Sequence, residues 1–483
     1  MAPRPSTLRI AFIHPDLGIG GAERLVVDAA LGLQKLGHSV DIFTSHHDPS
    51  HCFDETRDGT LRVYHIVSPF PRSVKGKFHI LLAHARQLHL TRYLLRSDSP
   101  QYDVYFVDQL STCVPFLRLL AGRRVVFYCH FPDKLLANGE FVEGKMHMRG
   151  GWLKRVYRLP MDWLEEITTR QADVILANSR FTSRVFKSYF PSIAQDPYVV
   201  YPGINLSAYE SKPDASDPDI EELSSERPTL LSLNRFEKKK NVALAIQSFF
   251  LLRKHLAGNK LSGHVDNLRL VIAGGYDPRL ENNMMTLVSL LDLAKLHSLT
   301  YNIISPSSSP TSIPPFNCTA NKPDILILLN FTTAQRSALL NARSTRALLY
   351  TPTNEHFGIG PVEAMACGLP VLACNTGGPT ESVLEVPEQA RTGWLRPPDA
   401  DLWASALMEI VALSDAERTD LAERAKVRAR ELFGMDAMAK TLDDKLQEAA
   451  AMGPISSYSL RTLTSFFVLL FSILLAVVYR LLT

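Results

Sequence analysis

The sequence predicts an α/β protein with two domains, each built on a parallel β-sheet. With 483 residues, the chain is too long for one ordinary hydrophobic core. Apolar runs such as residues 8–14 and 229–233 end in glycine-rich or polar loops that lead into helix-like patterns, which is typical of strands buried between helices. Ligands of such sheets bind beyond the carboxyl ends of the strands, so we expect functional residues in these loops.

The composition narrows the class of protein. A hydrophobic content of 46% and a charged content of 21% indicate a folded, partly membrane-linked protein rather than a disordered one. The net charge of +3 is too small to indicate a nucleic acid partner. Six scattered cysteines without a CxxC pair favour reduced thiols in a cytosol-facing protein and offer no zinc site. The N-terminus lacks the long apolar core of a signal peptide.

The stretch 348–382 organises the rest of the chain. Its apolar run 347–350 predicts a buried strand, which a loop and a short helix follow. Glu355 is expected at the carboxyl end of the strand and Glu363 in the first turn of the helix, with seven residues between them. Both carboxylates would then face the crevice beyond the sheet, although a bare pair with this spacing could equally be ordinary surface. Residues 357–360 expose backbone N–H groups that suit a phosphate at a helix N-terminus.

A glycine-rich turn follows the first strand. Gly20 and Gly21 let the backbone approach a ligand closely. A dinucleotide site would need G-x-G-x-x-G, but Glu23 occupies the place of the third glycine. The acidic residue that such a site needs at the end of the next strand is also missing, because Asp41 starts its strand. The turn therefore disfavours an NAD site.

Three further polar residues lie where strands end. His130 follows the apolar run 124–129, and a histidine at this edge faces the cleft, although a lone histidine is more often structural. Arg235 and Lys240 follow the run 229–233 directly. Cations at that edge can reach ligand phosphates, whereas elsewhere a charge run is usually solvated surface.

The string EHFGIGPVEAMACGLPVLACNTGGPTE (residues 355–381) resembles the donor-binding motif of the retaining GT-B glycosyltransferases of family 4. The resemblance covers most of residues 8–446 and is absent from the Ser/Pro-rich stretch 305–323. It implies the GT-B fold, in which two Rossmann-like domains face each other across a cleft. We expect an N-terminal acceptor domain over residues 1–205 and a C-terminal donor-nucleotide domain over residues 206–450, whose final helix crosses back over the first domain.

The resemblance also implies roles for individual residues. Arg235 and Lys240 match the family's R-x4-K pattern, which binds the nucleotide diphosphate. Glu363 would hold the ribose hydroxyls and Glu355 the sugar hydroxyls, while His130 would lie against the donor sugar near the reacting carbon. Catalytic roles are thus expected for Glu355 and His130. Donor-binding roles are expected for Gly20, Gly21, Arg235, Lys240, His356, Phe357, Gly358 and Glu363.

Within the family, EHFGIGPVEAM looks most like mannosyltransferases that extend the dolichol-linked oligosaccharide for protein N-glycosylation. This implies GDP-mannose as donor and dolichol-diphosphate-linked Man1GlcNAc2 as acceptor, with an α1,3 and then an α1,6 transfer. It also implies a place at the endoplasmic reticulum membrane, with the catalytic domains on the cytosolic face, and leaves open assembly with other transferases of the pathway. The alternatives are a membrane-anchored family 4 transferase with another donor or lipid acceptor, and a catalytically silent nucleotide-sugar-binding subunit.

The expected chemistry needs no metal and no cofactor. The sequence has no Asp-x-Asp constellation at a cleft position, and Arg235 and Lys240 can stabilise the departing diphosphate instead. The resemblance implies retention of configuration. A same-face displacement and a double displacement through a carboxylate both remain open.

Three segments bear on membrane contact. Residues 462–479 carry no charge and are long enough to cross a bilayer, which predicts a transmembrane helix over residues 460–480 rather than a buried core helix. The basic segments 75–96 and 145–158 each fit either a packed surface helix or a helix on the membrane surface. Three glycosylation sequons are interpreted as unused on a cytosolic domain: Asn205, Asn317 and Asn330.

Overall fold

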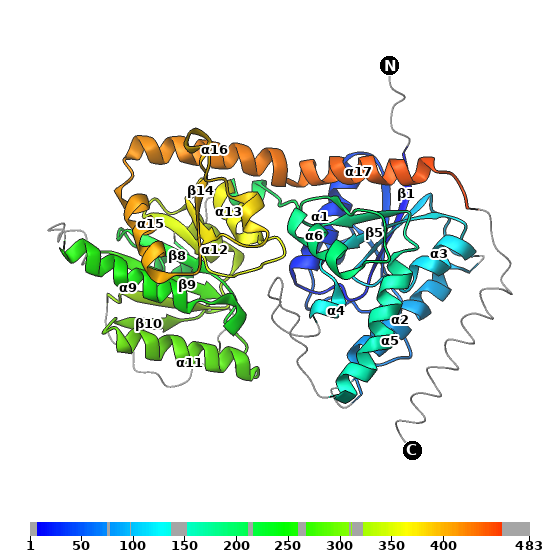
Figure 1. Cartoon of the computed structure of the whole chain (residues 1–483), viewed down its shortest axis with the longest axis horizontal. Helices are drawn as coiled ribbons and strands as arrows, with labels where there is room; N and C mark the ends of the chain where they lie inside the picture. The colour runs from blue at the N-terminus through cyan, green and yellow to red at the C-terminus, as the bar shows by residue number, and fades with distance from the viewer. Residues whose placement is uncertain are drawn as a thin grey trace.

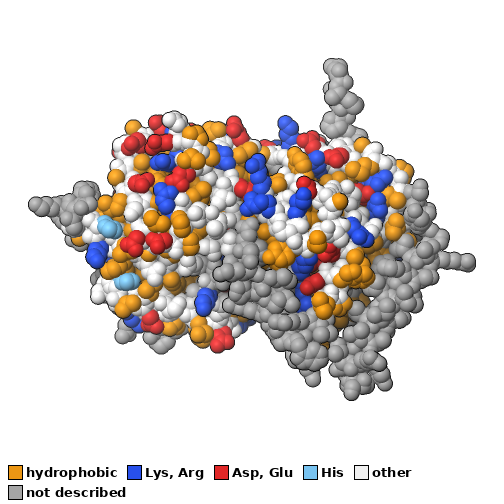
Figure 2. Space-filling view, viewed as in Figure 1, with side chains coloured by type: hydrophobic (Ala, Val, Ile, Leu, Met, Phe, Trp, Pro, Cys, Tyr) orange, Lys and Arg blue, Asp and Glu red, His pale blue; other side chains and the backbone are white. Residues whose placement is uncertain are grey.

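The protein consists of two α/β domains that lie side by side (Figure 1). The computed structural model describes residues 7–74, 78–96, 98–136, 152–210, 216–258, 267–308, 311 and 322–455. Each domain is built on a seven-stranded sheet in which neighbouring strands run parallel. Acidic and basic side chains are interspersed over both domains on the face in Figure 2, in keeping with the small net charge.

The N-terminal sheet has the strand order β3-β2-β1-β4-β5-β6-β7. Its strands are β1 (Arg9–His14), β2 (Ser39–Thr44), β3 (Arg62–His65), β4 (Val104–Asp108), β5 (Arg124–Cys129), β6 (Val174–Ala177) and β7 (Tyr198–Val199). The helices around it are α1 (Gly21–Lys35), α2 (His79–Leu94), α3 (Val114–Leu120), α4 (Asp133–Leu136), α5 (Trp152–Thr169) and α6 (Arg180–Tyr189).

The C-terminal sheet has the strand order β10-β11-β9-β8-β12-β13-β14. Its strands are β8 (Thr229–Leu233), β9 (Arg269–Gly274), β10 (Tyr301–Ile304), β11 (Ile325–Leu329), β12 (Thr345–Tyr350), β13 (Val371–Cys374) and β14 (Gly393–Arg396). The helices that follow β7 in the chain are α7 (Ser207–Glu210), α8 (Pro218–Glu221), α9 (Ala243–Gly258), α11 (Glu281–Leu296), α12 (Thr333–Asn341), α13 (Ile359–Ala366), α14 (Pro379–Ser382), α15 (Ala400–Ala412), α16 (Asp415–Phe433) and α17 (Met435–Ala451).

The strand order places the functional loops together. In the first sheet the direction of strand addition reverses at β1, which pairs with β2 on one side and β4 on the other. In the second sheet it reverses at β8, which pairs with β9 and β12. A crevice opens beyond the carboxyl ends of strands at such a switch point. The loops after β1, β8 and β12 therefore border one cleft.

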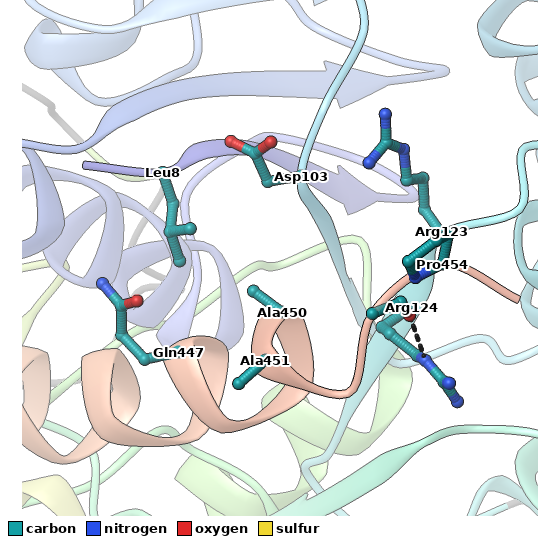
Figure 3. A pocket seen from close by; sticks show the side chains of 9 residues that line it. Leu8, Asp103, Arg123, Arg124, Gln447, Ala450, Ala451 and Pro454 are labelled. Carbon is teal, nitrogen blue, oxygen red and sulfur yellow. Dashed lines mark hydrogen bonds between the residues drawn. The ribbon is translucent and has the colours of Figure 1, made fainter. Parts of the chain in front are cut away.

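The last helix belongs spatially to the first domain. In Figure 1, α16 and α17 run along the top of the molecule, from the C-terminal domain onto the N-terminal one. Met438, Leu442 and Leu446 of α17 are buried in the core of the N-terminal domain. Beyond the helix, Arg124 donates to the carbonyl oxygens of Gly453 (2.8 Å) and Met452 (3.1 Å), at the edge of a hollow of about 290 Å³ (Figure 3).

The structure describes the three segments that were expected to bear on membrane contact to different extents. No helix within the described ranges is long and apolar enough to cross a membrane, and the predicted span 460–480 lies outside those ranges. The basic segment 75–96 forms α2 from His79 onward, and residues such as Arg86 and Leu90 are buried against the domain. Part of the second basic segment forms the start of α5, while residues 145–151 lie outside the described chain.

Candidate active site

A cavity of about 530 Å³ lies in the cleft between the two domains. Nine of the ten predicted site residues line it, and Gly20 instead lines an adjoining cavity of about 490 Å³ that shares Gly21 and Glu363. The predicted residues in the cleft cavity are Gly21, His130, Arg235, Lys240, Glu355, His356, Phe357, Gly358 and Glu363. The fold thus brings together residues that lie more than 300 positions apart in the sequence, from Gly21 to Glu363.

The loop after β12 differs in detail from the prediction. Glu355 lies five residues beyond the end of β12, where its backbone forms a bridge with Gly377. The helix α13 begins at Ile359, so Glu363 is its fifth residue and lies in the second turn, not in the first. Gly358 explains the early start: its φ of 87° lies in the left-handed region, which glycine adopts without strain and which turns the chain into the helix ahead of Pro361.

Glu355 and Lys240 form an ion pair in the cleft. The Nζ atom of Lys240 lies 2.5 Å from the Oε2 atom of Glu355, and both side chains are largely buried. Burial opposes ionisation of Glu355, but the Lys240 ammonium holds the pKa of this carboxyl below its ordinary value. The pair therefore stays charged and fixes the loop after β8 to the loop after β12.

Glu363 is held by two residues that the sequence did not reveal. Its Oε1 atom accepts hydrogen bonds from the hydroxyl of Tyr209 (2.6 Å) and from Nη1 of Arg336 (2.8 Å). Burial works against the charge of Arg336, but the carboxylate of Glu363 raises its pKa above the ordinary value. Tyr209 lies on the four-residue α7 and Arg336 on α12. Neither belongs to a sequence motif or follows a strand end, so the sequence did not indicate a role in the site.

Arg235 is the most exposed of the predicted residues that bind phosphate. Its side chain is 66% exposed, and Nη1 lies 3.3 Å from Glu237 in the same loop. The aliphatic part of the chain lies over Gly275, where an added Cβ atom would come within 3.4 Å of the Arg235 Cγ atom. The guanidinium thus remains accessible in the cleft while its stem is supported.

His130 is part of a hydrogen-bonded chain of three side chains, in which Asp108 and His14 are buried and His130 is partly exposed. Its Nε2 atom lies 2.9 Å from Oδ2 of Asp108, and Nδ1 of His14 lies 2.8 Å from Oδ1 of the same carboxylate. Although burial opposes both charges, His14 lowers the pKa of Asp108, and Asp108 raises the pKa of His14. An ionised carboxylate only accepts, so both histidine nitrogens that face it carry protons. The proton on Nε2 of His130 leaves its Nδ1 atom as the acceptor when the ring is neutral.

His14 and Asp108 were not predicted as site residues. Each is the last residue of its strand, β1 and β4, at the edge that faces the cleft. Their position at a strand end could have predicted both as site residues, because neighbouring parallel strands bring their carboxyl ends together.

His356 connects the two domains. Its ring stacks on that of Phe131 from the N-terminal domain, with centroids 3.8 Å apart, and its carbonyl oxygen accepts from Oγ of Ser179 (2.5 Å). Burial, with the cations of Lys240 and Lys239, lowers the pKa of His356 to about 4, so this imidazole is neutral at pH 7.

The described part of the chain contains no group of three His, Cys, Asp or Glu side chains arranged to hold a metal ion.

Comparisons with known proteins identify the family. Residues 19–208 match the model of Glycosyltransferase Family 4, and residues 322–428 match that of Glycosyl transferases group 1. The alpha-1,3/1,6-mannosyltransferase ALG2 of Rhizomucor pusillus is 43% identical over 455 residues, which cover 94% of each protein. Its counterpart from Saccharomyces cerevisiae is 40% identical over 445 residues, covering 91% of this chain and 84% of that protein. The chain belongs to the alpha-1,3/1,6-mannosyltransferase family.

Solved structures agree on the GT-B fold. Sucrose-phosphate synthase from Thermosynechococcus elongatus gives a TM-score of 0.65 at 18% identity and covers 92% of this chain and 100% of that one. The catalytic domain of starch synthase IV from Arabidopsis thaliana gives a TM-score of 0.63 at 14% identity, with coverage of 92% and 100%. Likenesses at this identity concern the fold alone.

The predicted site residues of this mannosyltransferase family member differ in their relation to the family models. Glu355 and Glu363 lie inside a region that matches a family model, whereas Arg235 and Lys240 lie between the two matched regions.

Proposed function

We propose that this chain transfers mannose from GDP-mannose to dolichol-diphosphate-linked Man1GlcNAc2, first in α1,3 and then in α1,6 linkage, with retention of configuration. The observation that carries the proposal is the 43% identity to an alpha-1,3/1,6-mannosyltransferase along 94% of both chains. The charged cleft adds a physical reason, because a nucleoside diphosphate that departs from a sugar needs cations and donors already in place.

The donor's nucleotide half would bind to the C-terminal domain. Arg235 and the backbone N–H groups of residues 358–360 are the donors for the diphosphate, at the beginning of α13. Glu363, whose orientation Tyr209 and Arg336 fix, would accept hydrogen bonds from the ribose hydroxyls. Because Oε1 of Glu363 already has two donors, Oε2 is the oxygen that serves the ribose.

The sugar half would lie between Glu355 and His130. An ionised Glu355 accepts from sugar hydroxyls, and its negative charge favours the positive charge that develops at the anomeric carbon. Lys240 moves no proton in this scheme; it keeps Glu355 ionised and adds positive charge near the diphosphate. In a same-face displacement, the leaving phosphate takes the acceptor's proton and no protein nucleophile is required. A double displacement would instead use Glu355 as the carboxylate.

We propose a reaction without a metal ion or cofactor, since Arg235, Lys240 and the backbone donors supply the charge stabilisation that a metal ion would give. The proposed reaction involves no nucleic acid.

The decisive experiment is a transfer assay with purified full-length protein. GDP-mannose and a lipid-diphosphate-linked Man1GlcNAc2 should yield two products, and linkage analysis should find α1,3 and α1,6 mannose. Efficient transfer from a different sugar nucleotide, or to a different lipid acceptor only, would replace the proposed substrates. Binding of GDP-mannose without hydrolysis or transfer would indicate a silent binding subunit instead.

We also propose attachment to the endoplasmic reticulum membrane through residues 460–480, with both domains on the cytosolic face, where other transferases of the pathway could assemble with it. The described chain ends at Ile455, whose N–H donates to the carbonyl of Gly122 on the N-terminal domain (3.1 Å). Deletion of residues 460–483 should leave a folded protein that no longer sediments with membranes through this segment. Aggregation of the truncated protein, seen by size-exclusion chromatography, would instead identify the segment as part of the core.

A further inference from the structure

The carboxyl ends of β2 and β3 carry three histidines that no step of the donor chemistry uses. The ring centroid of His65 lies 6.4 Å from that of His46 and 6.5 Å from that of His47, both in edge-to-face contact. The pairing of Thr44 with His65 in the parallel sheet explains the grouping, since the loop after β2 then leaves beside the end of β3. We call His46, His47 and His65 the histidine cluster. Imidazole N–H groups are hydrogen-bond donors, which suits an anionic ligand.

An exposed arginine lies in the loop that follows β3. One nitrogen of Arg72 contacts Oδ2 of Asp16 (2.8 Å), and the other oxygen of Asp16 contacts Nη1 of the buried Arg86 (2.9 Å). One carboxylate is thus shared by two guanidinium groups, which leaves a net positive charge. The Arg72 side chain is 62% exposed, so its remaining N–H groups reach solvent.

The same loop exposes apolar side chains. Val67, Phe70 and Val74 are 74%, 43% and 48% exposed. They lie in the nine residues after His65, with Phe70 before Arg72 and Val74 after it. We call residues 66–74 the apolar loop. Large apolar side chains gathered on a surface mark contacts with proteins, lipids or apolar ligands, and here they lie beside positive charge.

The histidine cluster is connected to the donor cavity. The carbonyl of His46 accepts from the N–H of Leu17 (2.8 Å), so its loop packs on the glycine-rich turn that leads to Gly21 in the cleft. Four strand spacings separate β3 from β5, whose end carries His130; at about 4.8 Å each, this amounts to about 19 Å along the edge of the sheet. A ligand with three sugars between its reacting end and an anionic group could span this distance.

We propose that the histidine cluster and Arg72 bind the diphosphate of a polyprenyl-diphosphate-linked acceptor, and that the apolar loop holds its first isoprene units. The proposal rests on the proposed function, because it assigns the anionic lipid end of that acceptor to this edge of the N-terminal sheet. Phosphate oxygens would accept hydrogen bonds from the N–H groups of Arg72, His46 and His65, whereas Nε2 of His47 donates to Oγ1 of Thr56 (3.1 Å). The isoprene chain would cover Val67, Phe70 and Val74, while the three sugars extend along the glycine-rich turn toward the cleft.

The test compares two acceptors in the full-length enzyme. One is Man1GlcNAc2 on an isoprenyl diphosphate, and the other is its methyl glycoside, which lacks lipid and diphosphate. In Arg72→Gln and His65→Ala, we expect the KM for the diphosphate acceptor to rise about tenfold or more, because each change removes a hydrogen bond to a charged group. The KM for the methyl glycoside and for GDP-mannose should stay the same. Arg57→Gln is the matched control, since Arg57 is similarly exposed and pairs with Asp54 outside the cluster.

A direct binding measurement separates this site from the proposed function. Isoprenyl diphosphate without sugars, titrated calorimetrically in detergent, should bind wild-type protein more tightly than Arg72→Gln. If wild type transfers mannose to neither acceptor, the proposed function fails, and this titration alone decides the site. Equal KM changes for both acceptors, or equal isoprenyl diphosphate binding by wild type and Arg72→Gln, would overturn the proposal. Loss of sedimentation with anionic vesicles alone, with diphosphate binding unchanged, would overturn it in favour of a bilayer contact.

Discussion

At the residue scale, the two carboxylates of the cleft have different partners. Glu355 is paired with the ammonium of Lys240, which belongs to another loop of the same domain. Glu363 is fixed by Tyr209 and Arg336 before any ligand arrives. A carboxylate that binds the ribose, whose charge does not change in the reaction, interacts equally with the ground state and the transition state, whereas a carboxylate beside the reacting carbon acts most strongly as charge develops.

Replacement of the two carboxylates should therefore change different kinetic parameters. Glu363→Gln should raise the KM for GDP-mannose about ten- to a hundredfold and largely spare kcat, since a hydrogen bond to a charged group contributes roughly 1.5–3 kcal/mol. Glu355→Gln should lower kcat at saturating donor by a similar factor. Tyr209→Phe serves as a control, because it removes only one bond to Glu363 and should change KM less. Steady-state kinetics decide the matter, and equal losses in one parameter would refute the division of roles.

Asp108 should act as a positioning residue for His130. Asn at this position offers one oxygen and one N–H2 group to two imidazoles that both donate to the carboxylate. One histidine must then change its tautomer or lose its bond. We expect kcat to fall about ten- to a hundredfold in Asp108→Asn, with donor KM nearly unchanged. NMR of 15N-labelled imidazoles should detect the altered tautomer. An unaltered tautomer with reduced kcat would point to a merely structural role.

At the scale of elements, the sequence predicted the buried strands best, because their residue types are determined by burial. The runs 124–129 and 229–233 coincide with β5 and β8 because buried strands of a parallel sheet are largely apolar. The start of α13 was misplaced because the left-handed conformation of Gly358 is a property of the folded loop. Helix α7, which supplies Tyr209, has four residues and no periodicity that could reveal it. Partners such as Arg336 and Glu363 meet only through tertiary packing.

The contact between α1 and α17 provides a test at this scale. A Cβ atom added at Gly32 of α1 would lie 2.5 Å from Cβ of Ala439 on α17. Ala would favour the helix by roughly 0.5–1 kcal/mol, but overpacking costs about 1–3 kcal/mol. Gly32→Ala should therefore lower the melting temperature by a few degrees. Adding Ala439→Gly should recover part of the loss, and calorimetry measures both. A melting temperature raised by Gly32→Ala alone would contradict this close packing.

At the scale of the whole molecule, the chain crosses between the domains twice at one place. Ile204 on the first crossing exchanges backbone hydrogen bonds with the second, donating to Phe433 (2.9 Å) and accepting from Met435 (3.0 Å). Two adjacent crossings of this kind can act as a hinge for domain closure. Any contact across the cleft then biases the equilibrium between open and closed forms.

Glu381 makes such a contact from the C-terminal domain. Its carboxylate accepts from the backbone N–H groups of Arg180 (2.8 Å) and Phe181 (2.7 Å), at the N-terminus of α6, and from the hydroxyl of Tyr201 (3.0 Å). A negative charge at a helix N-terminus is favoured by the helix dipole. The stacking of Phe131 on His356 lies in the same interface. These contacts hold the arrangement in which His130 and Glu355 line one cavity.

Removing this carboxylate should open the molecule. Three charge-assisted bonds are lost in Glu381→Ala, which should shift the equilibrium toward the open form by roughly 2–4 kcal/mol. Small-angle X-ray scattering should show a larger radius of gyration in the absence of donor, and kcat/KM should fall because closure must then be driven by substrate binding. Glu385→Ala is the matched control. The carboxylate of Glu385 forms its ion pair with Arg396 (2.6 Å), which belongs to the same domain, so this ion pair does not connect the two domains. If both variants scatter like wild type, Glu381 caps α6 without controlling the distance between the domains.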